Sequence, residues 1–149
     1  MKPFFLILFL LGSLCLHAQG RAPLREPDPH KPLLFATLPS VQPVQPEKLE
    51  VLLGHAVGDT VTFQLSPALR VTGVVTSVSD GSDKTLSSVV IRSQALGGAT
   101  FSFARRIGGD DTEYTGRLLS YNHGDALELV RENGKYRLEK RGLYDLLSE

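Results

Sequence analysis

Residues 126–141 read ALELVRE-NG-KYRLEKR, and this pattern predicts an antiparallel β-hairpin. Apolar and polar residues alternate on both sides of Asn133-Gly134, which is the period of a strand. Asn and Gly both tolerate positive φ, so the dipeptide favours a type I′ turn between the two strands. The face predicted to be shared consists of Leu127, Leu129 and, next to the turn, Arg131, opposed by Tyr136 and Leu138.

Similar alternation continues upstream of this hairpin, between clusters of Gly, Asp, Ser and Asn. Turn signals recur at roughly 8–12 residue intervals, which is typical of antiparallel all-β domains. We therefore expect an all-β fold, an antiparallel sandwich or barrel-like meander of about seven strands. The expected strands are residues 60–65, 70–79, 85–93, 99–106, 113–121, 126–132 and 135–141.

Three further segments complete the expected β domain, residues 47–149. Glu47–Leu53 follows Pro46 and ends at Gly54, which predicts two helical turns. Ile107–Thr112 (IGGDDT) combines glycine with acidic residues and predicts a loop. Leu143–Glu149 predicts a terminal helical turn.

The first eighteen residues have the layout of a secretory signal peptide. Lys2 precedes an apolar stretch of 13 residues, Phe4–Leu16, which is shorter than the roughly 18–20 residues of a membrane-spanning helix. We expect cleavage after Ala18, with Gly20 as the alternative, and no stable membrane span. The mature chain would be secreted or stay in the periplasm or cell envelope.

Cys15 is the only cysteine, and it lies inside the predicted signal peptide. The mature chain would then lack disulfides, thiol nucleophiles and cysteine zinc ligands. Loss of Lys2 changes Lys+Arg from 16 to 15 against 16 acidic residues, so the formal net charge becomes −1. This balance disfavours nucleic acid and anionic membranes as partners.

A proline-rich leader, residues 19–46, precedes the β domain. Its prolines lie at 23, 27, 29, 32, 39, 43 and 46, a spacing that prevents helix and favours an extended tether or surface arm. The apolar segment Leu33–Leu38 interrupts the leader. It could add a strand to a sheet edge or dock in a groove.

Two groups of residues are candidates for docking a partner. The apolar group consists of Leu33, Leu34, Phe35 and Leu38, and the basic group of Arg105, Arg106 and Arg117. The arginines fall on adjacent expected strands, so they either line up as a partner contact or form ordinary surface ion pairs. Tyr114, Tyr121, Tyr136 and Tyr144 supply either binding surface or core and rim.

The mature chain shows no catalytic motif, and we expect neither an enzyme nor a cofactor. An unknown enzyme would need His123, Asp125 and Glu128 to converge. His30, His55 and His123 all fall in expected loops. Asp80 with Asp83, and Asp110 with Asp111, could hold calcium weakly, but neither pair has the spacing of an EF-hand, so solvated carboxylates are the favoured interpretation.

Five short motifs taken together resemble a known module. They are GDTVTFQL at 58–65, VTGVV at 71–75, GATFSF at 98–103, YTGRL at 114–118 and YRLE at 136–139. The set resembles the N-terminal, propeptide-like β domain of secreted bacterial reprolysin-like zinc metallopeptidases, over about Leu49–Arg141. The sequence ends without the catalytic domain of that family, so no catalytic residue carries over.

The resemblance implies a non-catalytic protein-binding module that modulates, folds or inhibits a secreted metallopeptidase. We therefore expect a secreted or envelope protein as partner, a metallopeptidase first among them. Two alternatives stay open at this point. The chain could be an envelope or surface domain that binds glycan or protein, or a severed N-terminal piece of a longer protease.

Overall fold

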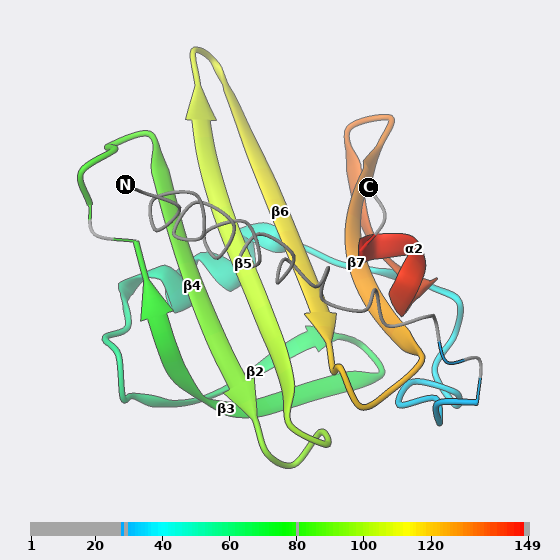
Figure 1. The fold of residues 1–149 in the computed structure, drawn as a ribbon. Helices are drawn as coiled ribbons and strands as arrows, with labels where there is room; N and C mark the ends of the chain where they lie inside the picture. The colour runs from blue at the N-terminus through cyan, green and yellow to red at the C-terminus, as the bar shows by residue number, and fades with distance from the viewer. Residues whose placement is uncertain (1–27, 29, 80, 148–149) are drawn as a thin grey trace, which may run out of the picture.

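The computed structural model describes residues 28, 30–79 and 81–147, and it shows a mostly antiparallel β fold (Figure 1). The predicted signal peptide, residues 1–18, and the start of the leader lie outside the described residues. Within the described part, none of the helices has the length and apolar character needed to cross a membrane. The elements are β1 (Val41–Pro43), η2 (Pro46–Gly54), β2 (Thr60–Ser66), β3 (Leu69–Val78), β4 (Leu86–Ser93), β5 (Ala99–Gly108), β6 (Asp111–Leu119), β7 (Asp125–Glu132), β8 (Lys135–Gly142) and α2 (Leu143–Leu147).

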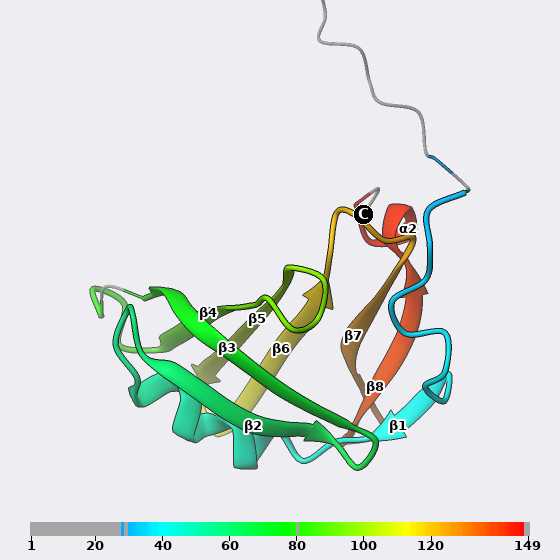
Figure 2. The same cartoon turned by 90° about the horizontal axis from the view of Figure 1, so that it is seen from below.

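The described strands form one eight-stranded antiparallel sheet in the order β1-β8-β7-β6-β5-β4-β3-β2. Strands β2 to β8 follow one another as a meander, and the sheet curls into a half-barrel (Figure 2). At the unclosed side, Ser66 Oγ of β2 donates a hydrogen bond of 2.5 Å to Gln42 Oε1 of β1. This side-chain bond connects the two edge strands where no backbone ladder joins them.

The seven expected strands are all present, which confirms the predicted all-β meander. Asn133 and Gly134 have φ angles of 51° and 76°, as the predicted type I′ turn requires. Leu129 pairs with Leu138, and Arg131 pairs with Tyr136, which is the predicted register. The structure gives one curled sheet, so the barrel-like alternative holds and the sandwich does not.

The prediction of a six-residue loop at Ile107–Thr112 is wrong. Strands β5 and β6 continue through this segment, and Gly108 pairs directly with Asp111. Gly109 supplies the left-handed backbone of the tight turn, with φ 59°. Asp111 is held by an ion pair to Arg131, in which Arg131 Nη1 lies 2.7 Å from Asp111 Oδ2. A two-residue connection therefore suffices where composition alone indicated a loop.

The helix predicted over Glu47–Leu53 is present as η2, Pro46–Gly54, and it is a 3-10 helix. Its buried residues are Pro46, Leu49 and Leu52, spaced three apart, which matches three residues per turn. Strand β1 was not predicted, because prolines disfavour central strands. It pairs with β8 as a three-residue edge strand that ends at Pro43, the position in a sheet that tolerates proline.

A row of aromatic rings runs across the inner face of the half-barrel. Phe63, Phe101, Phe103, Tyr114 and Tyr136 follow one another with centroid separations of 5.2, 6.1, 5.9 and 5.6 Å. Helix η2 lies behind β4 and β5 in Figure 1 and buries Leu49 and Leu52 against this core. Helix and rings together fill the inside of the sheet.

Gly73 allows β3 to cross β4 closely near the shift in their pairing register between Val75 and Ser77. A Cβ at this position would lie 2.6 Å from the carbonyl oxygen of Arg92. No other residue fits without moving backbone, so Gly73 permits the curl at this side of the sheet.

Candidate interaction surface

The end of the leader is bound to the sheet, and Asp125 holds it there. The carboxylate of Asp125, at the start of β7, is 3% exposed and accepts the backbone N–H groups of Leu34 at 2.6 Å and Phe35 at 2.9 Å. Phe35 is 1% exposed and belongs to the hydrophobic core. We call residues 30–45 the arm, since they cross the sheet as a docked segment.

Lys140 of β8 fixes the next part of the arm. Its Nζ donates to the carbonyl oxygens of Ala36 at 3.3 Å and Leu38 at 2.7 Å, and its backbone N–H donates to Ser40 O at 2.8 Å. Leu34 and Leu38 pack against the core, whereas Leu33 is 57% exposed. The predicted docking segment therefore lies against its own chain, with Leu33 facing solvent.

The three candidate arginines do not line up. Arg105 and Arg106 are neighbours on β5, so they point to opposite faces of the sheet. Arg105 faces inward to Glu50, whereas Arg106 and Arg117 share the outer face but lie at different levels, opposite Glu113 and Ser102 respectively. No single anion site is formed by these three side chains.

Glu50, Tyr114 and Arg105 form a polar cluster that attaches η2 to the inner face. Tyr114 Oη donates to Glu50 Oε1, and Arg105 Nη1 lies 2.8 Å from Glu50 Oε2. The Tyr114 hydrogen bond, aided by Arg105, lowers the pKa of Glu50 below its usual value. Burial and the Glu50 carboxylate raise the pKa of Tyr114 to about 12. The cluster holds its proton on tyrosine and its charge on glutamate, as a structural hydrogen bond requires.

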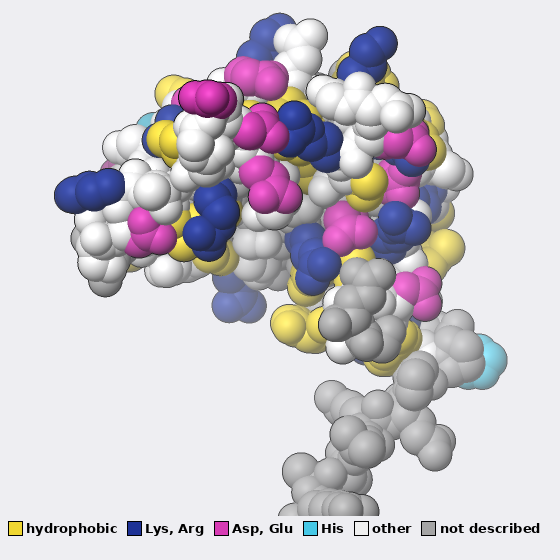
Figure 3. Space-filling model, turned by 90° about the horizontal axis from the view of Figure 1, so that it is seen from above, with side chains coloured by type: hydrophobic (Ala, Val, Ile, Leu, Met, Phe, Trp, Pro, Cys, Tyr) yellow, Lys and Arg dark blue, Asp and Glu magenta, His cyan; other side chains and the backbone are white. Residues whose placement is uncertain are grey.

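Six charged side chains form a ladder on the outer face of β6, β7 and β8. We call this set the outer ladder, and it consists of Arg117, Glu128, Arg141, Glu139, Arg137 and Glu132. Figure 3 shows the molecule from the side of the hairpin tips, where basic and acidic side chains are intermixed.

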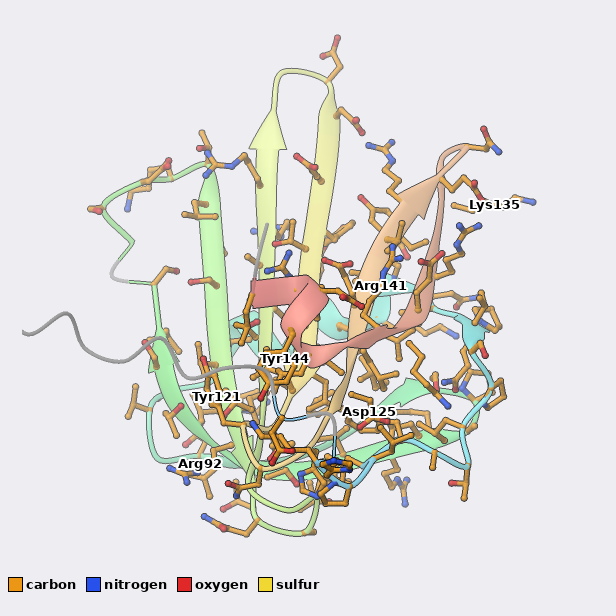
Figure 4. The ribbon with its side chains drawn as sticks, turned by 45° about the vertical axis from the view of Figure 1, so that its right-hand side comes forward. Arg92, Tyr121, Asp125, Lys135, Arg141 and Tyr144 are labelled. Carbon is orange, nitrogen blue, oxygen red and sulfur yellow. The ribbon has the colours of Figure 1, made fainter. Side chains whose placement is uncertain are left out.

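The glutamates at the centre of the outer ladder lie directly opposite one another. Glu128 pairs with Glu139 in the β7–β8 register, an arrangement that is unfavourable for two like charges. Arg141 bridges them, with Nε 3.4 Å from Glu128 and Nη2 2.8 Å from Glu139, and Figure 4 labels it on β8. Arg117 adds a contact of 2.9 Å to Glu128. The glutamate side chains are 15% and 13% exposed, so the arginines form the accessible layer.

The outer face of β4, β5 and β6 is different, because it carries few charges. Alternation places thirteen side chains there, of which Arg92, Arg106, Asp111, Glu113 and Arg117 are charged and stand towards the margins. We call the eight uncharged ones the open face: Leu86, Ser88, Val90, Thr100, Ser102, Ala104, Thr115 and Leu119.

The small side chains of the open face leave two hollows. One of about 250 Å³ lies between Ser88, Val90, Ser102, Ala104 and Thr115. The other, of about 370 Å³, extends from Ser102 and Thr115 past Gly116 to Arg117 and Glu128 of the outer ladder. Helix α2 packs against β8 and lies in front of β7 in Figure 1. In the described part of the chain it leaves the outer face of β4–β6 uncovered.

The residues considered for chemistry do not converge. His123 Nδ1 lies 3.0 Å from Ser120 Oγ, Asp125 holds the arm, and Glu128 faces the opposite side of β7 in the outer ladder. His55 Nδ1 lies 3.2 Å from Asp59 Oδ2, and His30 is exposed.

The two acidic pairs are those for which solvated carboxylates were favoured over weak calcium binding. Asp80 lies outside the described residues. Asp83 accepts hydrogen bonds from the backbone N–H and the hydroxyl group of Thr85. Asp111 forms an ion pair with Arg131. Within the described ranges, no group of three or more His, Cys, Asp or Glu side chains is arranged to hold a metal ion.

The chain was compared with protein-family models, with curated proteins and with solved structures, and no match was found in any of the three.

The open face was missed by the sequence analysis, which examined charged and apolar clusters. Its signal was present, because Ser88, Ser102 and Thr115 alternate with buried residues in three consecutive strands. A row of small residues opposite a core is a pattern that can be searched for.

Proposed function

We propose that this chain is a non-catalytic protein-binding module that contacts its partner through the open face. The observation that carries the proposal is the composition of that face: an uncharged floor of small side chains across three central strands, with arginines at its margin. Depletion of charged residues at the centre and the presence of arginine are two features that this face shares with protein interfaces.

The size of the side chains supports a protein as the occupant. Ser102, Ala104 and Thr115 offer little protruding surface, so a strand or helix can lie close to the sheet across the hollows. Arg92 and Arg106 stand beside this floor, and their guanidinium groups can bind carboxylate groups. The partner element should therefore be apolar or hydroxyl-bearing at its centre and acidic at its ends.

Features of the sequence support a proposal for the compartment in which this binding takes place and for the kind of partner. The predicted signal peptide favours an exported chain, and the five β motifs resemble the propeptide-like domain of secreted metallopeptidases. We therefore propose a secreted or envelope protein as partner, with a zinc metallopeptidase as the first candidate. Its activity, folding or latency is what the module would modulate.

The test measures binding of residues 19–149 to purified zinc metallopeptidases secreted by the source organism, with peptidase activity as a second readout. We expect a stoichiometric complex with altered activity, abolished by Ser102→Arg on the open face. The matched control is Thr62→Arg, a similarly exposed hydroxyl residue on β2 outside that face. Equal binding by both variants, or no binding by any, would overturn the proposal.

A further inference from the structure

A third hollow lies away from the open face, where three distant segments of the chain meet. It measures about 400 Å³, within the usual size range of small-molecule sites, and lies among Asp28, His30 and Lys31, Tyr121 and Asn122, and Tyr144 of α2. Figure 4 shows Tyr121 and Tyr144 close together on the same side of the molecule.

Direct contacts hold the walls of this hollow in place. Lys31 Nζ donates to the carbonyl oxygen of Tyr121 at 2.8 Å and lies 5.2 Å from the centroid of the Tyr144 ring. The backbone N–H of Asp28 donates to Tyr144 Oη at 2.9 Å. Gly124 donates to the carbonyl oxygen of Pro32, next to the Asp125 clamp on the arm. The hollow therefore forms together with the docked arm.

The exposed ring of Tyr121 is the feature that the fold does not explain. This side chain is 68% exposed, the highest value among the large hydrophobic residues of the described chain. A tyrosine ring offers an apolar face together with a polar hydroxyl, a combination used where a ligand has one apolar and one wet side.

The polar groups around the ring define the class of ligand. The positive charge of Lys31 and the negative charge of Asp28 balance one another, so the hollow favours neither an anion nor a cation. Asn122 and His30 add planar donors and acceptors. A pyranose ring satisfies both requirements, because its C–H face can pack on Tyr121 while its hydroxyl groups bond to these side chains.

We infer that the hollow between Tyr121, Tyr144 and Lys31 is a binding site for a neutral glycan. The site is independent of the open face, so a glycan and a protein partner can bind at the same time. A chain with both sites would hold its protein partner at a polysaccharide surface.

The test uses calorimetric titration of residues 19–149 with four neutral probes: cellopentaose, xylopentaose, mannopentaose and chitopentaose. We expect at least one to bind, and Tyr121→Ala to weaken it about tenfold or more, as truncation of a central aromatic contact does. Tyr121→Phe keeps the ring and should keep most of the affinity. Binding should change little with salt, because the ligand is uncharged.

The matched control is Ile107→Ala, which removes another exposed apolar side chain at the far β5–β6 turn. Absence of binding to all four probes would overturn the inference, as would equal affinity of Tyr121→Ala and the parent chain. Capture of a protein by the Tyr121 surface, without competition from any probe, would also overturn it. The protein-binding proposal is tested by Ser102→Arg and stands or fails separately.

Discussion

The two faces of β4, β5 and β6 share one backbone and differ in almost every chemical respect. The inner face carries stacked rings, of which Phe101 and Phe103 are 1% exposed, together with Val89 and Ile91 at 0%. The outer face carries serine, threonine and alanine between the same positions. Because adjacent residues belong to opposite faces, stability and recognition can change independently in this sheet.

The largest effect should come from the inner face. Replacing Phe103 by Ala removes the middle ring of the aromatic row and should lower the free energy of unfolding by about 3–5 kcal/mol. Urea unfolding followed by circular dichroism measures this. The neighbouring variant Ser102→Ala, on the outer face, is the control. Equal unfolding midpoints for the two variants would show that the assignment of the faces is wrong.

The arm clamp should give the second largest effect. Asp125→Ala leaves the buried N–H group of Phe35 and the partly buried N–H group of Leu34 without their acceptor, which should cost about 2 kcal/mol. Hydrogen exchange of these two amides should accelerate more than exchange in the β7–β8 hairpin. Asp125→Asn, which keeps one side-chain oxygen, should lose less. Unchanged exchange in Asp125→Ala would mean that the arm is held without the carboxylate.

Local patterns predicted the inner face well, because alternation alone specifies which residues are buried. The hairpin at Asn133-Gly134 and the buried positions of the first strand, Val61, Phe63 and Leu65, follow from period two. The docking of Phe35 does not follow from this alternation, since it depends on a carboxylate ninety residues away in sequence. Asp125 resembled a turn residue or a remote catalytic candidate until the fold placed it beside the arm.

The same limit applies to the candidate sites. Arg105, Arg106 and Arg117 were grouped by strand and charge. The ion pairs of Arg105 and Arg117 depend on η2 and β7, which sequence spacing cannot place. The hollow at Tyr121 needs residues 28, 30–32, 121–122 and 144 together. Sites assembled across such separations become visible only when the topology is known.

The cluster on the inner face should show a defined dependence on pH. Tyr114→Phe removes the hydrogen bond to Glu50 and should cost about 1 kcal/mol at neutral pH. The pKa of Glu50 is lowered in the folded chain, so its stabilising contribution is present above its ordinary pKa of 4.5 and is lost as the pH falls through the folded value. The difference between parent and variant should therefore shrink in acid.

The tyrosine of this cluster gives the complementary result in base. Its pKa is raised from 10.0 to about 12, so the folded chain keeps the proton that the unfolded chain has lost. The corresponding stability is present below pH 10 and disappears as the pH rises through about 12. Ultraviolet absorbance of tyrosinate should show one late-titrating group, missing in Tyr114→Phe. Titration of all tyrosines near 10 would contradict the hydrogen bond between Tyr114 and Glu50.

Ser102→Arg should change the stability of the fold least and the binding of the partner most. Ser102 is exposed at the centre of the open face, so Ser102→Arg should shift the free energy of unfolding by no more than about 0.5 kcal/mol. Its long charged side chain would fill the hollow beside Thr115 and stand close to Arg117, which leaves a partner both a clash and an unpaired charge. Thermal unfolding and partner titration on the same sample separate these effects. If Ser102→Arg both lowers the unfolding temperature and abolishes binding, Ser102 contributes to the stability of the fold. Stability and binding would then not be separated between the two faces of the sheet.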